Sequence, residues 1–569
     1  MPPVLGEIRR SQLVTTFGVG AIVAIGDESF MICGLDDWPV TVPDLHEPRL
    51  ERSLGVSGFA RPPAGETGLD IPVVRFPDIV WCPGCKRLAK HDHFAGRTGN
   101  KCMDCGVGLV PSRFVVVCEN GHIDSFPYFN WVHAGGKQSA ARTHELRIEA
   151  GGNTASLRDI QVSCSCGRSR TMEGAFGKFA LRGVRGCSGR RPWLNTNDEQ
   201  CVSLPRTLQR GASNVWFALA HSAISIPPWS EGAFKLLNKY WHVLQHVPEE
   251  SLRSTLTGMH ILPQDSPYNI DDLILAVSQR RRAGADDLDR GVDLRVQEFE
   301  ALVRGKKEVS RDQDFVCEPA VSIPGAVAGW IETVMLVKRL REVRALETFS
   351  RLNPPSRRPG QMSPPIFERR TGWLPAIDVI GEGVFLRLRE DRLQSWESRL
   401  DVRKRIERVA RTYTARGELH RTITPRLMLI HSLAHALIGQ WALNSGYPAA
   451  SLRERLYVAK HMAGLLIYTA SSDSAGSLGG VIAQAEPAHL EAALHECILR
   501  ASWCSTDPVC IETDAGGVDA LNIAACHACL LLPEVSCEEQ NGLLDRGLLV
   551  GTPRAPDIGY FAQLLGNNY

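Results

Sequence analysis

Residues 82–105 read CPGCKRLAKHDHFAGRTGNKCMDC, with two Cys-X-X-Cys pairs separated by a spacer of sixteen residues. Each tight Cys-X-X-Cys turn directs two sulfurs toward one point, and the spacer allows the two turns to meet. Four thiolates at the corners of a tetrahedron form a closed zinc site with no open position for water. The stretch therefore predicts a zinc ribbon with one structural zinc, bound by Cys82, Cys85, Cys102 and Cys105.

A second set of cysteines follows within a segment rich in Gly, Arg and Ser, as in RGCSGRRPW at residues 185–193. Such a segment has little apolar material for a core, so a metal is the better explanation of its cysteines. We expect a second zinc site formed by Cys164, Cys166, Cys187 and Cys201. The motif Cys118-Glu-Asn-Gly-His122 lies between the two sets, and its Cys and His either join one of the sites or pack in a turn.

A third group of five cysteines lies near the C-terminus, where a zinc site needs only four ligands. Cys526 and Cys529 form a Cys-X-X-Cys turn, and Cys537 follows closely. Cys510 is preferred narrowly over Cys504 as the fourth ligand. The predicted set is therefore Cys510, Cys526, Cys529 and Cys537, while Cys33, Cys317 and Cys497 are interpreted as ordinary buried residues.

The 569-residue chain has 44% hydrophobic and 22% charged residues, which is typical of a folded protein with more than one domain. It has no apolar run near the roughly 18 residues that span a bilayer. Met1–Arg10 also lacks the apolar core of a secretory signal, so we expect a cytoplasmic protein. Disulfides rarely persist in that compartment, and clustered cysteines there indicate metal binding.

The pattern of apolar runs, glycines and prolines predicts an α+β multidomain protein with a β-rich N-terminal region containing zinc-ribbon modules, a helical middle and a mixed α/β zinc-containing C-terminal domain. Amphipathic segments, the last near 325–349, make the middle mainly helical. The predicted segments are 1–77 (β-rich), 78–210 (zinc ribbons with two metal sites), 211–352 (mainly helical), 353–365 (Pro-rich linker) and 366–569 (C-terminal domain).

The net charge is only +1, yet Arg accounts for 52 of the 64 basic residues. Arg binds phosphates in bidentate fashion, so local clusters indicate nucleic-acid contacts, although a charged run is also typical of an ordinary solvated face. A Ser- and Gly-rich loop at 471–480 is a further candidate for a phosphate contact. The candidate nucleic-acid-binding residues are Arg280, Arg281, Arg282, Arg357, Arg358, Arg403, Lys404, Arg408, Arg411, Ser474 and Ser477.

The sequence contains no Walker A motif, HExxH or GxSxG, so we expect no ATPase activity and no enzymatic activity from this chain alone. His431 and His435 are four residues apart on one predicted helix face, a spacing that suits a metal. The preferred interpretation is that they pack inside the helix bundle. The alternative is a metal-dependent nuclease or hydrolase that uses His431, His435 and Asp473.

Several of these motifs resemble the DrmB subunits of DISARM, a bacterial defence system against phages. The matching stretches are RRSQLVTTFG (9–18), GLDDW (34–38), CENGHID (118–124), RTLQRGASN (206–214), DSAGSLGG (473–480) and ACHACL (525–530). The part from about 425 to 550 is also similar to a zinc-containing module at the C-terminus of certain superfamily-two DNA helicases. In those helicases the cysteines lie close together before the Cys-X-X-Cys turn, whereas Cys504 and Cys510 lie far upstream of it here.

The resemblance implies an accessory role. DrmB-like proteins act with a separate helicase subunit, DrmA, and the complex restricts phage DNA while it spares methylated host DNA. It follows that residues 366–569 form a helicase-associated zinc-binding domain. The expected cofactor is Zn²⁺ at two to three structural sites. The expected partners are a DrmA-like helicase, DNA and a DNA methyltransferase of the same system, with no membrane. A pure scaffold subunit is a second alternative.

Overall fold

A computed structural model describes residues 4–40, 42–63, 65, 69–95, 99–134, 144–151, 156–290, 293–355, 363–415, 421–469, 479–517 and 520–566. The chain forms two compact units, each assembled from separate stretches of sequence. The first comprises Met1–His46, Glu51–His221 and Arg344–Ile377, and the second comprises Glu47–Leu50, Ser222–Val343 and Asp378–Tyr569. Among the described residues, no helix combines the length and apolar character that crossing a membrane requires.

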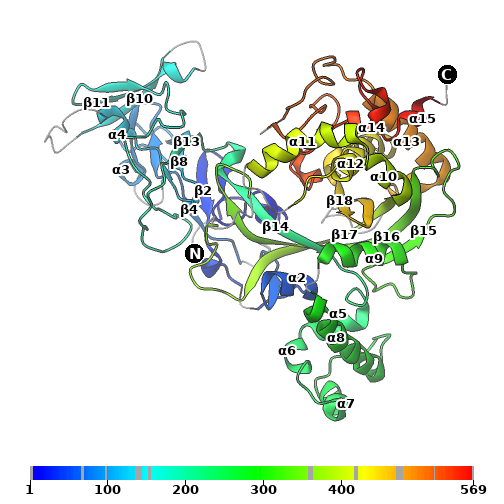
Figure 1. The fold of residues 1–569 in the computed structure, drawn as a ribbon. Coiled ribbons are helices and arrows are strands. Elements are labelled where there is room, and N and C mark those ends of the chain that lie inside the picture. Colours follow the sequence, from blue (N-terminus) through cyan, green and yellow to red (C-terminus); the bar gives the residue numbers. More distant parts are fainter. Residues whose placement is uncertain are drawn as a thin grey trace. The chain divides into compact units, whose positions relative to one another are not determined.

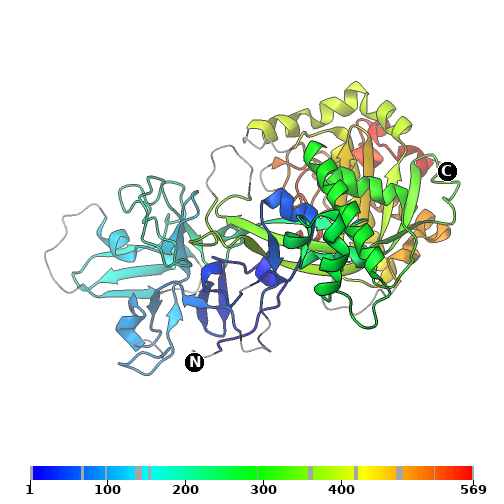
Figure 2. The same cartoon turned by 90° about the horizontal axis from the view of Figure 1, so that it is seen from below.

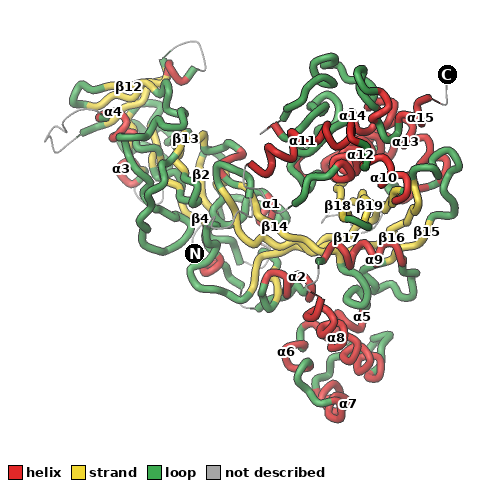
Figure 3. The backbone as a smooth tube through the Cα atoms, viewed as in Figure 1, coloured by secondary structure: helices red, strands yellow, loops and turns green. Residues whose placement is uncertain are grey.

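The first unit is built mainly from short strands and long loops (Figure 3). Its three-stranded sheets have the orders β1-β2-β4 and β13-β8-β9, and its six-stranded sheet has the order β12-β11-β10-β6-β5-β7. The strands are β1 (Ile22–Ile25), β2 (Glu28–Ile32), β3 (Gly58–Ala60), β4 (Val73–Arg75), β5 (Ile79–Trp81), β6 (Arg87–Lys90), β7 (Val110–Pro111), β8 (Phe114–Val117), β9 (Ile123–Ser125), β10 (Leu146–Ala150), β11 (Ile160–Cys164), β12 (Ser169–Thr171) and β13 (Arg206–Gln209). The short helices are α1 (Gln12–Thr15), α2 (Pro48–Leu54), α3 (Asp92–Ala95) and α4 (Tyr128–His133).

Two antiparallel hairpins of this unit place cysteines in their turns. In β5–β6, Trp81 pairs with Leu88, so the turn between them carries the first Cys-X-X-Cys pair. In β8–β9, Val117 pairs with Ile123, and the turn carries Cys118 and His122. The apolar β8 sequence FVVV is buried at all four positions, which anchors this second turn against the unit's interior.

The second unit is organised around a seven-stranded sheet with the main order β14-β16-β17-β19-β18, in which β15 pairs with β16 and β3 pairs with β17. Helix α12 packs against β18 and β19, and helix α13 packs against α12 (Figure 1). The strands are β14 (Phe217–Ile224), β15 (Val316–Pro319), β16 (Ile331–Ser350), β17 (Trp373–Leu388), β18 (Leu452–Ala459) and β19 (Met462–Thr469). The helices after β17 are α10 (Glu390–Glu397), α11 (Leu400–Ala415), α12 (Pro425–Ser445), α13 (Pro487–Ala501), α14 (Gly547–Val550) and α15 (Ala562–Gly566).

The helices between β14 and β15, shown in green in Figure 2, include a helical subdomain with a core of its own. They are α5 (Gly232–Asn238), α6 (Trp241–Leu244), α7 (Glu249–Gly258), α8 (Ile270–Arg290) and α9 (Leu294–Arg304). Leu237, Leu256 and Val277 are buried where α5, α7 and α8 meet. Helix α9 instead contributes Phe299 and Leu302 to the core beside the sheet.

The expectation of a helix near 325–349 is wrong, because residues 331–350 form the long strand β16. This strand mixes apolar and charged residues, so its spacing fits a helix face about as well as a strand. Pairing with its neighbours in the sheet buries charged positions such as Glu342 and Arg344. The tertiary environment therefore determines the strand, which sequence periodicity alone did not reveal.

The predicted fold class is confirmed: the N-terminal region is β-rich, the middle region contains the helices α5–α9, and the C-terminal region mixes helices with strands. The five segments predicted from the sequence do not coincide with the two compact units, because each unit contains residues from more than one segment. The boundaries of the five segments stay a prediction of where independently folding domains begin and end.

A buried ion pair joins β18 to α9. Arg455 binds Glu298 through two hydrogen bonds of 2.7 Å, and both side chains are fully buried. Tyr457 donates a third hydrogen bond to the same carboxylate. Although burial alone would raise the pKa of Glu298, the charge and hydrogen bonds of Arg455 hold that pKa below its usual value.

We expect Arg455→Ala to destabilise the protein by about 3–5 kcal/mol, because it leaves the Glu298 carboxylate buried without its partner. Denaturant unfolding monitored by fluorescence measures this change. Lys460→Ala, at an exposed position just after the same strand, is the matched control and should stay within about 0.5 kcal/mol of the parent. Equal effects of the two substitutions would contradict a structural role for the pair.

Candidate metal centres

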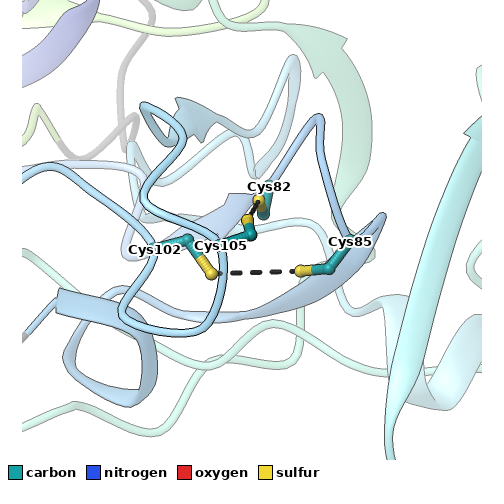
Figure 4. Close-up of side chains that lie close together, drawn as sticks. All are labelled: Cys82, Cys85, Cys102 and Cys105. Atoms are coloured by element: carbon teal, nitrogen blue, oxygen red, sulfur yellow. Dashed lines mark hydrogen bonds between the residues drawn. The ribbon is translucent and has the colours of Figure 1, made fainter.

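Four cysteines meet between the β5–β6 hairpin and the loop after α3, where the sequence predicts the zinc ribbon (Figure 4). The sulfurs of Cys82 and Cys105 are 3.1 Å apart, and those of Cys85 and Cys102 are 3.9 Å apart. All four ligand atoms lie within 4.8 Å of one another. Four sulfurs on two tight turns fit a tetrahedral structural zinc.

The second predicted set does not form a single site, because the structure divides its cysteines between two groups. Cys187 and Cys201 lie with Cys118 and His122, the motif whose role the sequence left open. Strand β13 follows Cys201 and pairs with β8, which brings the loop from 187 to 201 back to the β8–β9 turn. The spacing of the cysteines along the chain does not predict this strand pairing.

His122 is oriented by a carboxylate behind it. Its Nδ1 lies 3.3 Å from the Cys118 sulfur, and its Nε2 lies 2.5 Å from Glu199. A carboxylate on the far nitrogen fixes the ring and its tautomer, as is usual for histidines that bind zinc. A hydrogen bond from Cys187, followed by contacts with His122, lowers the pKa of Cys118 to about 4, which favours the thiolate that binds metal.

The other half of the second set, Cys164 and Cys166, lies with two histidines that the sequence pattern does not predict. His133 at the end of α4 places Nε2 3.3 Å from Cys166, and His144 places Nδ1 3.1 Å from Cys164. The second ring nitrogen of His133 donates to the Phe129 carbonyl at 2.7 Å. Neither histidine belongs to a short Cys/His motif, so only the folded chain identifies them.

The C-terminal group unites Cys504, Cys510, Cys526 and Cys529. The sulfur of Cys504 lies 3.5 Å from that of Cys526, and Cys510 lies 3.8 Å from Cys529. The prediction that chose between Cys504 and Cys510 is therefore corrected, since both face the Cys-X-X-Cys turn. The ordered loop after α13 carries these two residues to the turn from far upstream in the sequence.

Cys537 was predicted for that same site but lies elsewhere. It meets His431 and His435 of α12 and Glu454 of β18, with its sulfur 3.2 Å from Nε2 of His431. The two histidines thus do face the core, as expected, but they share it with a carboxylate and a thiol. Asp473, the third residue of the hydrolase alternative, lies outside the described residues.

The predicted nucleic-acid residues of α8 differ in their surroundings. Arg280 is buried, stacks on Trp241 with its guanidinium 4.2 Å from the ring centroid, and donates to Asn238. Arg281 donates to the carbonyls of Leu244 and Val247. Both guanidiniums thus contact groups of the helical subdomain itself, whereas Arg282 is exposed, and nucleic-acid contact by the three residues stays a prediction.

The predicted residues of α11 lie on the surface. Arg403, Lys404, Arg408 and Arg411 are all exposed, while Val402, Ile406 and Val409 form the buried face of the same helix. The remaining cation, Arg405, is bound to the buried carboxylate of Asp545 at 2.6 Å. Arg357, Arg358, Ser474 and Ser477 lie outside the described residues.

Parts of the chain are similar to known protein families. A family model described as the MrfA Zn-binding domain matches residues 433–530, which include the C-terminal four-cysteine group. A second model, described as a domain of unknown function (DUF8724), matches residues 9–217. The chain is also 30% identical over 523 residues to the DISARM protein DrmB of Bacillus paralicheniformis, covering 87% of this chain and 92% of that protein.

The zinc-binding domain and the Cys/His groups identify zinc as the cofactor, at multiple structural sites.

We expect Cys504→Ser to lower the zinc content by about one ion per chain, because it removes one of four thiolates from a closed site. Cys497→Ser is the matched control, since Cys497 is a buried thiol of α13 that donates to the Leu494 carbonyl. Elemental analysis of the purified variants measures the difference. Unchanged zinc in Cys504→Ser would contradict the assignment of this ligand.

We expect Glu199→Gln to weaken metal binding at the Cys118 site by about 10- to 100-fold, because the amide orients His122 less well than the carboxylate. Competition with a chromophoric chelator measures the affinity. Glu173→Gln, at an exposed residue paired with Arg158, is the control and should leave the affinity unchanged. Equal affinities in both variants would show that Glu199 does not support the site.

Proposed function

Because this chain belongs to the DrmB family of DISARM proteins, we propose that it is a non-catalytic, zinc-stabilised, DNA-binding subunit that works beside a superfamily-two helicase of the DrmA type against phage DNA. The MrfA Zn-binding domain match supports the zinc part. The proposal places the protein in the cytoplasm, with DNA and the helicase as partners and a DNA methyltransferase of the same system as a third.

The exposed basic face of α11 carries the DNA-binding part of the proposal. Lys404, Arg408 and Arg411 follow the helical spacing of four and three residues, so they lie along one side of the helix. The apolar side of α11 packs on the core, which holds this row of charges on a rigid element. Cations in a row can neutralise successive phosphates and release their counterions.

The sequence explains why a helicase partner is proposed. It has no Walker A motif, so ATP hydrolysis would have to come from another subunit. The near-neutral net charge also implies weak DNA affinity for the isolated chain, since non-specific binding depends on an excess of cations. A partner that supplies further DNA contacts would make the local basic face of α11 effective.

We expect the combined substitutions Lys404→Ala, Arg408→Ala and Arg411→Ala to weaken DNA binding by the complex of this chain with its helicase. The slope of log affinity against log salt should fall by about one for each phosphate that the variant no longer neutralises. Gel shifts over a range of salt concentrations measure both quantities, and ATPase assays with and without this chain test the functional coupling.

Arg304→Ala is the control for these substitutions, because Arg304 is an exposed cation at the end of a different helix, α9. It should leave the salt slope unchanged. The proposal fails if the triple variant and the control bind DNA identically. A complex that forms without any salt-dependent affinity for DNA would instead identify the chain as a scaffold.

A further inference from the structure

A second group of metal-binding side chains lies in the interior of the second unit, apart from the four-cysteine group. His431 and His435 project from adjacent turns of α12, Glu454 from β18, and Cys537 from the loop after the short 3-10 turn Glu534–Ser536. One donor atom from each lies within 4.8 Å of all the others. The side chains of both histidines and of Glu454 are 0% exposed.

The distances are those of donors that converge on one point. Oε1 of Glu454 lies 3.1 Å from Nε2 of His431 and 3.6 Å from Nε2 of His435. Two imidazoles four residues apart present their nitrogens on the same face of a helix, which is why this spacing recurs in zinc proteins. The carboxylate and the thiol approach that face from the sheet and from the loop.

The orientation of His435 favours a metal over a hydrogen-bond network. Its Nδ1 donates to the Leu530 carbonyl at 2.8 Å, which leaves Nε2 with its lone pair directed into the group. That Nε2 is buried and has no hydrogen-bond partner among the described residues, and the same holds for Oε2 of Glu454. Buried polar atoms without partners are costly, and a metal ion would satisfy both.

The backbone around Cys537 is also arranged for a thiolate. The amides of Glu539 and Asn541 direct their hydrogens at its sulfur, at 3.3 and 3.2 Å. The amide of Glu538, the residue after Cys537, donates to Oε1 of Glu454 at 3.0 Å. These contacts hold the loop against β18 with the sulfur and the carboxylate side by side.

We propose that His431, His435, Glu454 and Cys537 bind a divalent transition-metal ion, zinc by the chemistry of the donors, in a closed structural site distinct from the four-cysteine group. One carboxylate and one thiolate balance the two charges of the ion, so the buried assembly is neutral. Mixed nitrogen, oxygen and sulfur donors in a four-coordinate set suit zinc.

Four protein donors leave no position for a water nucleophile, so the site joins α12, β18 and the C-terminal loop and does not hydrolyse a substrate. It also lies next to the four-cysteine group along the chain. Leu530, whose carbonyl orients His435, directly follows Cys529, so residues 530–537 run from one metal site to the other.

The test is the number of metal ions on the intact chain, counted by native mass spectrometry and elemental analysis after purification with zinc present. The parent should carry five zinc ions, one for each Cys/His group of the described residues. Cys537→Ala should carry one fewer, and Cys537→His, which restores a ligand, should regain it. Cys497→Ala, at the buried thiol on α13, should match the parent.

Two results would overturn the proposal: a parent chain that never exceeds four ions, or a folded Cys537→Ala that keeps the parent's count. If Cys537→Ala does not fold, the parent's count decides by itself. Cobalt substitution gives a second measurement. Loss of the Cys537 ligand should remove a sulfur-to-cobalt charge-transfer band, while the bands from the two four-cysteine groups should stay. None of these readouts depends on DNA, so their failure is distinguishable from failure of the proposed function.

Discussion

Coordination of zinc by thiolates is the interaction on which the ribbon at residues 82–105 depends. The strands there are short, and the apolar cluster around the first site consists of Val80, Phe94 and Leu109 together with two of the ligands, Cys82 and Cys102. So small an apolar cluster offers little hydrophobic free energy against the entropy of ordering the loops. Metal binding supplies folding free energy directly, because the site does not exist in the unfolded chain.

A metal site can be predicted from the sequence to the extent that its ligands lie close together along the chain. The two Cys-X-X-Cys pairs at 82–105 specify their site almost completely, since each turn fixes two ligands. The ligands at 118, 122, 187 and 201 come together because β13 pairs with β8. The spacing of these residues along the chain does not predict that pairing. His133 was missed for a related reason: it ends an aromatic helix, where a histidine usually packs, and its role depends on a loop that comes from elsewhere.

The same distinction separates the correct and incorrect parts of the predicted fold. The helix predicted around His431 and His435 is present as α12, in which residues 426–435 are buried without a break. Strand β16 was mistaken for a helix because two of its charged residues, Glu342 and Arg344, are buried in the sheet. A periodicity argument assumes that charge faces solvent, and in this chain that assumption often fails.

The excess of Arg over Lys acquires a different meaning in the structure. Arg351, Arg455 and Arg546 are among the largest fully buried side chains, and each is held by carbonyls or carboxylates of its own unit. Guanidinium suits this use because it is weakly hydrated and offers several donors in a fixed plane. A high Arg count alone is therefore poor evidence for nucleic-acid binding here, since part of it stabilises the interior. The informative cations are those that the fold leaves exposed on a helix whose other face packs on the core, and among the predicted residues α11 provides four of them.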